Sequence, residues 1–488
     1  MTPQEMVERA LETSTASTGR TGDCIAIVDE ASNANLRWAG NTLTTNGLSR
    51  SHTLTVIAIE HRADGMATGV VSRSGVRADQ IGDVVGAAQQ AASESSAAQD
   101  AQPLVGAATR QPFGNWDEPV AATEFGVFGG FTADLGNAFA EAAAADTKLY
   151  GYAEHELTCT FVGTSSGLRL RHDQPSGRVE VNAKSADMER STWAGTSTRD
   201  FANVDVASLH AQLAQRLDWA KRRIELPAAR YETLLTPTAV ADLLIFLYYA
   251  ANAKDALDGR TVFSKPGGGT RVGERLCALP VTLRSDPAAP GLECAPFVIA
   301  HASSRYTSVF DNGLALAPTD WISGGNLAAL VQTRHSAELT GLPVTPAIDN
   351  LIFEATAAGG TVAAAGGAGG AGVGPTAAGV SALDQMIAST RRGLLVNCLW
   401  YIRSVDPQTL LVTGLTRDGV YLVENGEVTG AVNNFRFNDS PVGMLDRLDE
   451  VGQSAPCLPR EWSDYFPRTA APALRVAGFN MSSVSRAL

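Results

Sequence analysis

The stretch Thr238-Ala-Val-Ala-Asp-Leu-Leu-Ile-Phe-Leu-Tyr-Tyr-Ala-Ala-Asn-Ala-Lys-Asp-Ala-Leu257 decides how the second half of the chain is interpreted. Its length and composition predict a single helix, and its first half is apolar on nearly every side. A helix of that kind has to be buried in its own domain or against a partner. Asp242 interrupts the apolar run, which is also too short to span a bilayer. The stretch therefore predicts a buried helix at the centre of a folded domain.

The segments on either side of this helix differ in character. Before it, a helix over residues 2–18, paired strands, a helix over 74–98 and further strands predict an antiparallel sheet flanked by helices. After it, short strands alternate with Gly and Pro, and Arg417-Asp-Gly419 and Glu424-Asn-Gly426 are typical of hairpin turns. We expect an α+β fold with an N-terminal α/β domain over residues 1–224 and a C-terminal β-rich, barrel-like or sandwich domain over 228–488.

One low-complexity tract interrupts the second half. Residues 358–379 are almost entirely Gly and Ala, with a few Val, Thr and Pro residues. The tract contains a Gly-x-Gly-x-x-Gly match, but it has no Lys, and neither a clear strand nor a clear helix borders it. We interpret it as a flexible surface loop.

Charge and cysteine usage narrow the class of protein. The chain of 488 residues carries a formal net charge of −13, which argues against a nucleic-acid partner, and Lys221–Arg223 is interpreted as a solvated helix end. Its six cysteines are scattered without a Cys-x-x-Cys pair, as is typical of reduced cytoplasmic thiols. No apolar targeting segment is visible at the N-terminus. We expect a cytoplasmic protein with no membrane partner.

Catalytic motifs are weak throughout the sequence. There are seven histidines and no His-Glu-x-x-His motif. Glu154-His155-Glu156 precedes Cys159, but His155 and Cys159 lie about 13 Å apart along an extended strand, too far to share one zinc ion. Gly163-Thr-Ser-Ser-Gly167 matches the serine hydrolase elbow in letters only, because a strand and not a helix follows it.

Several segments together resemble the TldD/PmbA family, once called modulators of DNA gyrase. Each motif is weak alone, but their order and spacing are specific, and they cover nearly the whole chain outside the Gly/Ala tract. The segments are Leu36–Gly47, Gly163–Gly167, Arg178–Ala186, Tyr231–Pro237, Gly259–Phe263, Gly393–Val396, Trp400–Arg403, Asp406–Gly414, Glu424–Glu427 and Asn434–Asn438.

The resemblance assigns the chain to the non-catalytic, TldE/PmbA-like branch. TldD-like chains carry a zinc-binding His-Glu-x-x-x-His motif in the helix after the domain boundary and a cysteine near the C-terminus. Here the motif positions are occupied by Leu244, Ile245 and Tyr249, and no histidine occurs between His210 and His301. Leu and Ile offer no donor that zinc accepts, so we expect no catalytic residue and no metal in this chain. Cys457 lies in the region of the family cysteine and is expected to be a buried thiol.

The resemblance also implies a partner and a substrate. We expect a heterodimer with a TldD-like zinc metalloprotease subunit, with the zinc in that partner, in a complex that cleaves unfolded or precursor peptides. This chain would form part of the chamber and stabilise the zinc-bearing subunit. Trp400, Tyr401 and Arg403 are the candidate interface or substrate-path residues, and an ordinary barrel core with a solvated Arg is the competing interpretation.

Two other functions stay open from the sequence. One is an autonomous peptidase or hydrolase with a displaced site, for instance around His155, Glu156 and Cys159. The other is a homodimeric peptide-binding protein. Zinc content of the isolated chain and its behaviour beside a TldD-like chain distinguish these functions from the first.

Overall fold

A computed structural model describes residues 1–18, 22–106, 114–355, 362–363 and 381–485. Most of the predicted Gly/Ala loop, residues 358–379, lies outside the described residues. Within the described ranges, none of the helices combines the length and the apolar content needed to cross a lipid bilayer.

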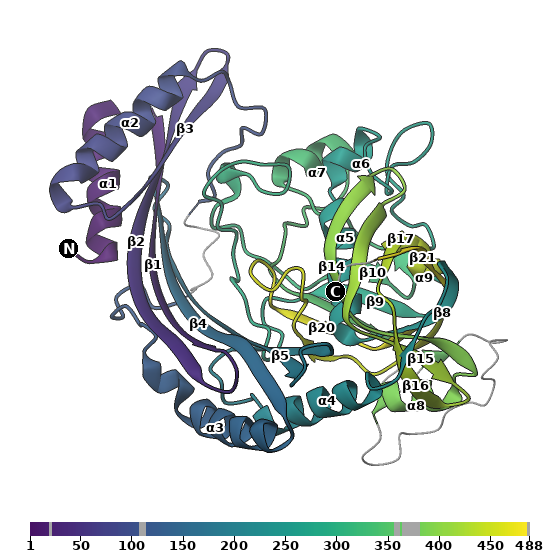
Figure 1. Ribbon diagram of the computed structural model, residues 1–488. Coiled ribbons are helices and arrows are strands. Elements are labelled where there is room, and N and C mark those ends of the chain that lie inside the picture. Colours follow the sequence, from purple (N-terminus) through teal and green to yellow (C-terminus); the bar gives the residue numbers. More distant parts are fainter. Residues whose placement is uncertain (19–21, 107–113, 356–361, 364–380, 486–488) are drawn as a thin grey trace.

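The N-terminal half is one long, curved antiparallel sheet with helices on its convex face (Figure 1). The strand order is β3-β2-β1-β4-β5-β6. The strands are β1 (Gly22–Trp38), β2 (Leu43–Arg62), β3 (Gly65–Ser74), β4 (Thr147–Thr164), β5 (Arg169–Ser185) and β6 (Ser191–Thr198). The covering helices are α1 (Pro3–Thr18), α2 (Ile81–Glu94), α3 (Gly129–Ala144) and α4 (Val206–Trp219).

Alternation along β1 explains the layering of this half. Cys24, Ala26 and Val28 belong to the core that includes residues of α1 and α2, whereas Ile25 and Ile27 point to the opposite face. On that concave face the isoleucines share a core with side chains from the C-terminal half, such as Phe310. The sheet therefore wraps around the second half and packs against it with its own apolar face.

The C-terminal half is built around a closed ring of five strands. β8 (Ala229–Leu235), β14 (Arg392–Asp406), β15 (Leu411–Glu424), β17 (Phe435–Asp439) and β21 (Leu474–Val484) each pair with two others of the set. β7 (Arg223–Ile224), β13 (Val362–Ala363), β16 (Glu427–Val432) and β18 (Leu448–Val451) extend this sheet. The predicted α+β fold with an N-terminal antiparallel sheet and a barrel-like C-terminal part is confirmed.

A second, six-stranded sheet lies beside the barrel. Its order is β11-β10-β9-β12-β20-β19. Its strands are β9 (Val281–Ser285), β10 (Thr319–Ser323), β11 (Asn326–Leu327), β12 (Leu351–Ala355), β19 (Ala455–Cys457) and β20 (Thr469–Ala471). The remaining helices are α5 (Pro237–Ala250), α6 (Ala253–Leu257), α7 (Arg334–Thr340), α8 (Ala382–Ser389) and α9 (Pro441–Asp446).

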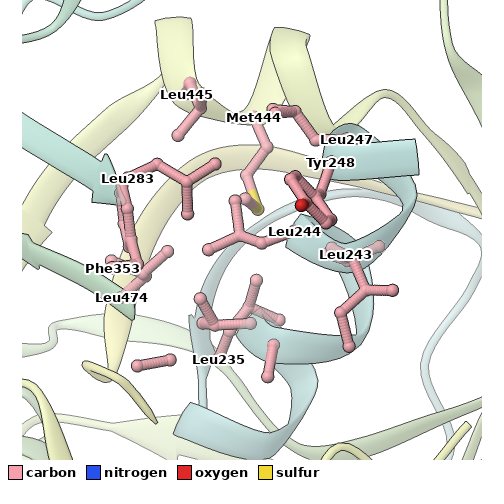
Figure 2. Close-up of a cluster of buried hydrophobic side chains, with 14 of the residues drawn as sticks. Leu235, Leu243, Leu244, Leu247, Tyr248, Leu283, Phe353, Met444, Leu445 and Leu474 are labelled. Carbon is pink, nitrogen blue, oxygen red and sulfur yellow. The ribbon is translucent and has the colours of Figure 1, made fainter. Parts of the chain in front are cut away.

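Helix α5 is buried in the largest core of the chain, as its composition predicts. Thr236 caps it by accepting a hydrogen bond from the N–H of Ala239, and Pro237 occupies the first turn. Figure 2 shows Leu243, Leu244 and Leu247 among side chains from both C-terminal sheets. The single helix predicted over residues 238–257 is wrong in one respect, because α5 ends at Ala250 and Asn252 caps the separate helix α6.

One other expectation is corrected. Arg417–Gly419 is a bulge inside β15 and not a hairpin turn, since Asp418 and Gly419 adopt φ of 50° and 134° while the strand continues. Residues 169–185 form one continuous strand, β5, and the polar segment that follows contains β6. The Glu424-Asn-Gly426 turn is confirmed, because it joins β15 to β16.

Candidate functional site

Leu244, Ile245 and Tyr249, the three positions of interest on α5, lie in two different environments. Leu244 and Ile245 are 1% and 0% exposed and belong to the main apolar core, where Leu244 lies near Leu283, Phe353 and Met444 (Figure 2). Neither side chain has a polar atom that could hold a metal ion. A zinc ion at these two positions does not fit the residues that are present.

Tyr249, the third position, belongs to a cluster of aromatic rings. Its ring centroid lies 5.2 Å from that of Trp462 and 5.9 Å from that of Tyr306. The Tyr306 hydroxyl donates a hydrogen bond to the carbonyl oxygen of Tyr249 at 2.8 Å. Burial raises the pKa of Tyr249, so its hydroxyl stays neutral at physiological pH.

Trp462 also forms a wall of an open recess of about 430 Å³. The recess joins α5, the bulged end of β14 and the loop after β19. Its lining residues are Phe246, Trp400, Tyr401, Ile402, Arg403, Ser404, Glu461, Trp462 and Tyr465. The structure thus brings together all three residues that the sequence indicated on β14, and it places them beside the helix of the family motif.

A strained backbone at Tyr401 shapes one side of the recess. Tyr401 has a φ of 52°, which is costly for an aromatic residue, and its side chain is 53% exposed. The Glu461 carboxylate holds this bulge, because it accepts hydrogen bonds from the N–H groups of Tyr401 and Ile402 at 2.8 and 3.1 Å. It also accepts one from Arg403 Nη1 at 2.8 Å. A single carboxylate, on a side chain that is 12% exposed, therefore fixes the rim.

Sequence reasoning missed Glu461 and its neighbours. The signal that could have found them is the segment Arg460-Glu-Trp-Ser-Asp-Tyr-Phe466, which is rich in charged and aromatic residues between two prolines. Such a composition is unusual for a connecting loop, and loops carry function more often than the elements they connect.

Asp242 on α5 contacts the loop that carries Glu461. It is fully buried in α5, and its Oδ1 accepts a hydrogen bond from the N–H of Glu461 at 2.9 Å. Its Oδ2 has no hydrogen-bond partner among the described residues. Burial raises the pKa of Asp242 well above its ordinary value.

Arg460 joins the recess to the N-terminal half. Its guanidinium lies 5.2 Å from the Trp193 ring of β6 and 4.8 Å from the Trp400 ring of β14. It also donates to Asp418 Oδ2 at 2.6 Å and to the Cys398 sulfur at 2.9 Å. One face of the Trp400 ring therefore packs against Arg460, and other atoms of Trp400 line the recess.

The other residues considered from the sequence have structural partners. His155 is buried and hydrogen-bonds through its two ring nitrogens to Thr123 Oγ1 at 2.7 Å and to the Arg199 carbonyl oxygen at 2.8 Å. Cys159 and Cys457 are buried, and burial raises the pKa of both thiols, to about 11 and about 12. Across the described ranges, no three His, Cys, Asp or Glu side chains gather as a metal ion would require.

Ser165 also acts in a turn. Its hydroxyl donates to Asp23 Oδ1 at 2.7 Å, and it accepts from the N–H of Cys24 at 3.1 Å. No strand-to-helix elbow is present at Ser165, because β5 follows it within the described chain.

Comparison with known proteins decides the family. The family described as "PmbA/TldA metallopeptidase C-terminal domain" matches residues 228–483, more than half of the chain. The chain belongs to the PmbA/TldD family. The match spans α5, the closed barrel and the aromatic recess, so all of these features lie in the part that the PmbA/TldD family shares. No curated protein matches the sequence.

Solved structures share the fold over the whole chain. TldE from Thermococcus kodakarensis has a TM-score of 0.73 at 15% identity, covering 97% of this chain and 99% of its own. A putative modulator of DNA gyrase from Thermotoga maritima has a TM-score of 0.71 at 14% identity, with 98% and 100% covered. A second putative modulator of DNA gyrase, from Bacteroides thetaiotaomicron, has a TM-score of 0.71 at 12% identity, with 99% of each chain covered.

Proposed function

We propose that this chain is a non-catalytic, TldE-like subunit of a metallopeptidase complex. Its partner is a TldD-like chain of the same family, which holds the zinc ion and performs the cleavage. This subunit stabilises the partner and forms part of the wall that guides an unfolded or precursor peptide.

One observation carries the proposal. The positions on α5 where metal ligands are expected in a TldD-like chain hold Leu244 and Ile245, which fill an apolar core. Without nitrogen, oxygen or sulfur ligands no metal-bound water becomes acidic, so no hydroxide nucleophile forms there. The helix is retained as a packing element.

The aromatic recess supports a role in peptide binding. Exposed aromatic rings such as Tyr401 and Tyr465, 53% and 73% exposed, offer rigid apolar area at low entropic cost. Arg403 and the main chain of the bulge add polar groups at the rim. A peptide side chain of almost any apolar kind fits such a surface, which suits a sequence-tolerant peptidase.

Two measurements test the assignment. The chain is expressed alone and together with a TldD-like family member, and zinc content, size and peptide cleavage are measured. We expect a stable complex in which only the partner binds stoichiometric zinc, and no cleavage by this chain alone. Zinc and peptidase activity in the isolated chain would favour the autonomous enzyme instead. A peptide-binding dimer that ignores the partner would favour the third function.

A further experiment tests the recess. In the assembled complex, Tyr401→Ala and Trp462→Ala are expected to raise KM for an unfolded peptide with little change in kcat, because they remove uniform binding. Phe125→Ala, at an aromatic residue 43% exposed on the N-terminal half, is the matched control. Unchanged KM in both recess variants would remove the recess from the peptide path.

A further inference from the structure

The outer edge of β2 is open over half of its length. β3 pairs with β2 only from Thr53 to Arg62, whereas β1 pairs with β2 from Leu43 to Glu60 (Figure 1). The segment Leu43–Ser51 therefore has a strand on one side only. Every residue of this segment except Gly47 is exposed, so no helix or loop of the described chain covers the edge.

The hydrogen-bonding pattern of β2 determines which main-chain groups face the open side of this edge. The carbonyl oxygen of His52 accepts a hydrogen bond from the N–H of Gly75, on the β3 side. Alternate residues of an antiparallel strand direct both of their main-chain groups to the same side. Asn46, Leu48 and Arg50 therefore point their N–H and C=O groups outward, where no described main-chain group meets them.

The edge lacks the features that usually prevent strand addition. It contains no Pro and no Lys, and Arg50 is its single charged residue, paired at 3.7 Å with Glu124. Leu48, at its centre, is 47% exposed. The pairing of β2 with β1 is regular from Thr45 to Ser51, and the one irregularity lies at Thr44, at the end of the segment. An exposed apolar residue in an open, regular edge is typical of a surface that pairs with another strand.

We propose that this edge pairs with the same edge of a second copy of the chain, through a two-fold axis at Leu48. Antiparallel pairing about that axis places Leu48 opposite its own copy and Asn46 opposite Arg50. All three outward-facing residues are then hydrogen-bonded. No like charges stand opposite each other, and the two leucines cover one another.

The pairing joins two six-stranded sheets into one of twice the width. The pairing does not involve the recess, because β2 lies across the sheet from β5 and β6. Those two strands contact the recess loop through Arg178 with Ser463 and through Trp193 with Arg460. The test of this interface is therefore separate from the test of the recess.

A charge-swap experiment tests the interface. Sedimentation of the purified full chain is expected to show a concentration-dependent dimer. Leu48→Glu and Leu48→Lys are each expected to weaken it by roughly tenfold or more, since like charges then face each other on the axis. An equimolar mixture of the two variants is expected to restore the dimer. A monomer at all concentrations, or a dimer that both variants leave unchanged, would overturn the proposal.

Cross-linking tests the register. The pairing places Thr45 opposite Ser51, so a mixture of Thr45→Cys and Ser51→Cys chains is expected to form an intermolecular disulfide under mild oxidation. Thr45→Cys alone is the matched control, because two copies of that position do not face each other. The six native cysteines are buried and give little background. Equal cross-linking in the control and the mixture would contradict this register.

Discussion

The carboxyl group of Asp242 accepts a hydrogen bond from the main-chain N–H of Glu461, and Glu461 in turn holds the strained bulge at Tyr401. The buried Asp242 on α5 thus supports the exposed Tyr401 through Glu461. The chain of contacts connects the core to the rim of the recess, and it makes the rim sensitive to the charge of Asp242.

Stability is expected to depend on the ionisation of Asp242. Burial raises the pKa of this carboxyl in the folded chain above its unfolded value. The stability that its neutral form provides is therefore complete below the unfolded pKa and is lost as pH rises through the folded pKa. The Asp242→Asn side chain stays neutral at every pH. The free energy of unfolding of this variant, measured with urea, is therefore expected to rise relative to that of the wild type between pH 5 and pH 8.

A surface carboxylate provides the control for that experiment. Hydrogen bonds from Thr409 and Gln408 lower the pKa of the half-buried Asp406, so its contribution to stability has the opposite sign and is lost as pH falls. Asp406→Asn should not reproduce the pH dependence of Asp242→Asn. Parallel unfolding curves for wild type and Asp242→Asn at both pH values would contradict the role of Asp242.

Arg460 is expected to be a major contributor to stability. Arg460→Met keeps much of the volume but leaves the Asp418 carboxylate, on a side chain that is 11% exposed, without its ion pair, which costs about 3 kcal/mol. Adding Asp418→Asn to that variant is expected to recover part of the loss, because no unpaired charge is left buried. Urea unfolding of the two single variants and the double variant measures the coupling.

The contact between His301 and Asp29, which joins the two halves, is expected to depend on pH. The Asp29 carboxylate accepts a hydrogen bond from His301 Nε2 at 2.7 Å and raises the pKa of His301. A raised histidine pKa contributes stability below its unfolded value of about 6.5, which is lost as pH rises through the folded value. NMR titration of His301 should show the raised pKa, and Asp29→Asn should return it toward the ordinary value.

Leu244 is expected to behave as a packing residue. Leu244→Ala removes a side chain that is 1% exposed, and should cost about 2–5 kcal/mol in free energy of unfolding. Leu339→Ala, at a leucine 48% exposed, should cost less than about 0.5 kcal/mol. Equal effects of the two variants would show that the α5 core is not packed as described.

Much of the fold is predictable from local patterns. The Asp64-Gly65 pair is typical of a hairpin turn and predicts the hairpin of β2 and β3. The apolar run on α5 predicts the burial of that helix. The break before α6 is harder to predict, because the Asn252 side chain that caps α6 also donates to the carbonyl oxygen of Arg305, which is distant along the chain. The division of the chain at residues 224–228 stays a prediction.

The candidate site could be predicted only in part. Trp400, Tyr401 and Arg403 form a distinctive cluster in the sequence, and they do line the recess. Glu461 lies far from them along the chain, and its role depends on a bulge that no local pattern indicates. The Asp418-Gly419 pair led to a wrong prediction of a hairpin turn, because residues with positive φ occur in bulges as well as in turns.

The loop that carries Arg460 belongs to neither half alone. It is held to the N-terminal sheet through Trp193 and Arg178 and to the barrel through Trp400 and Asp418. If either half unfolds, the other loses partners for buried charged groups. A chain of this length would ordinarily melt in separate steps, but the shared loop should make its unfolding cooperative, with one heat-absorption peak in calorimetry.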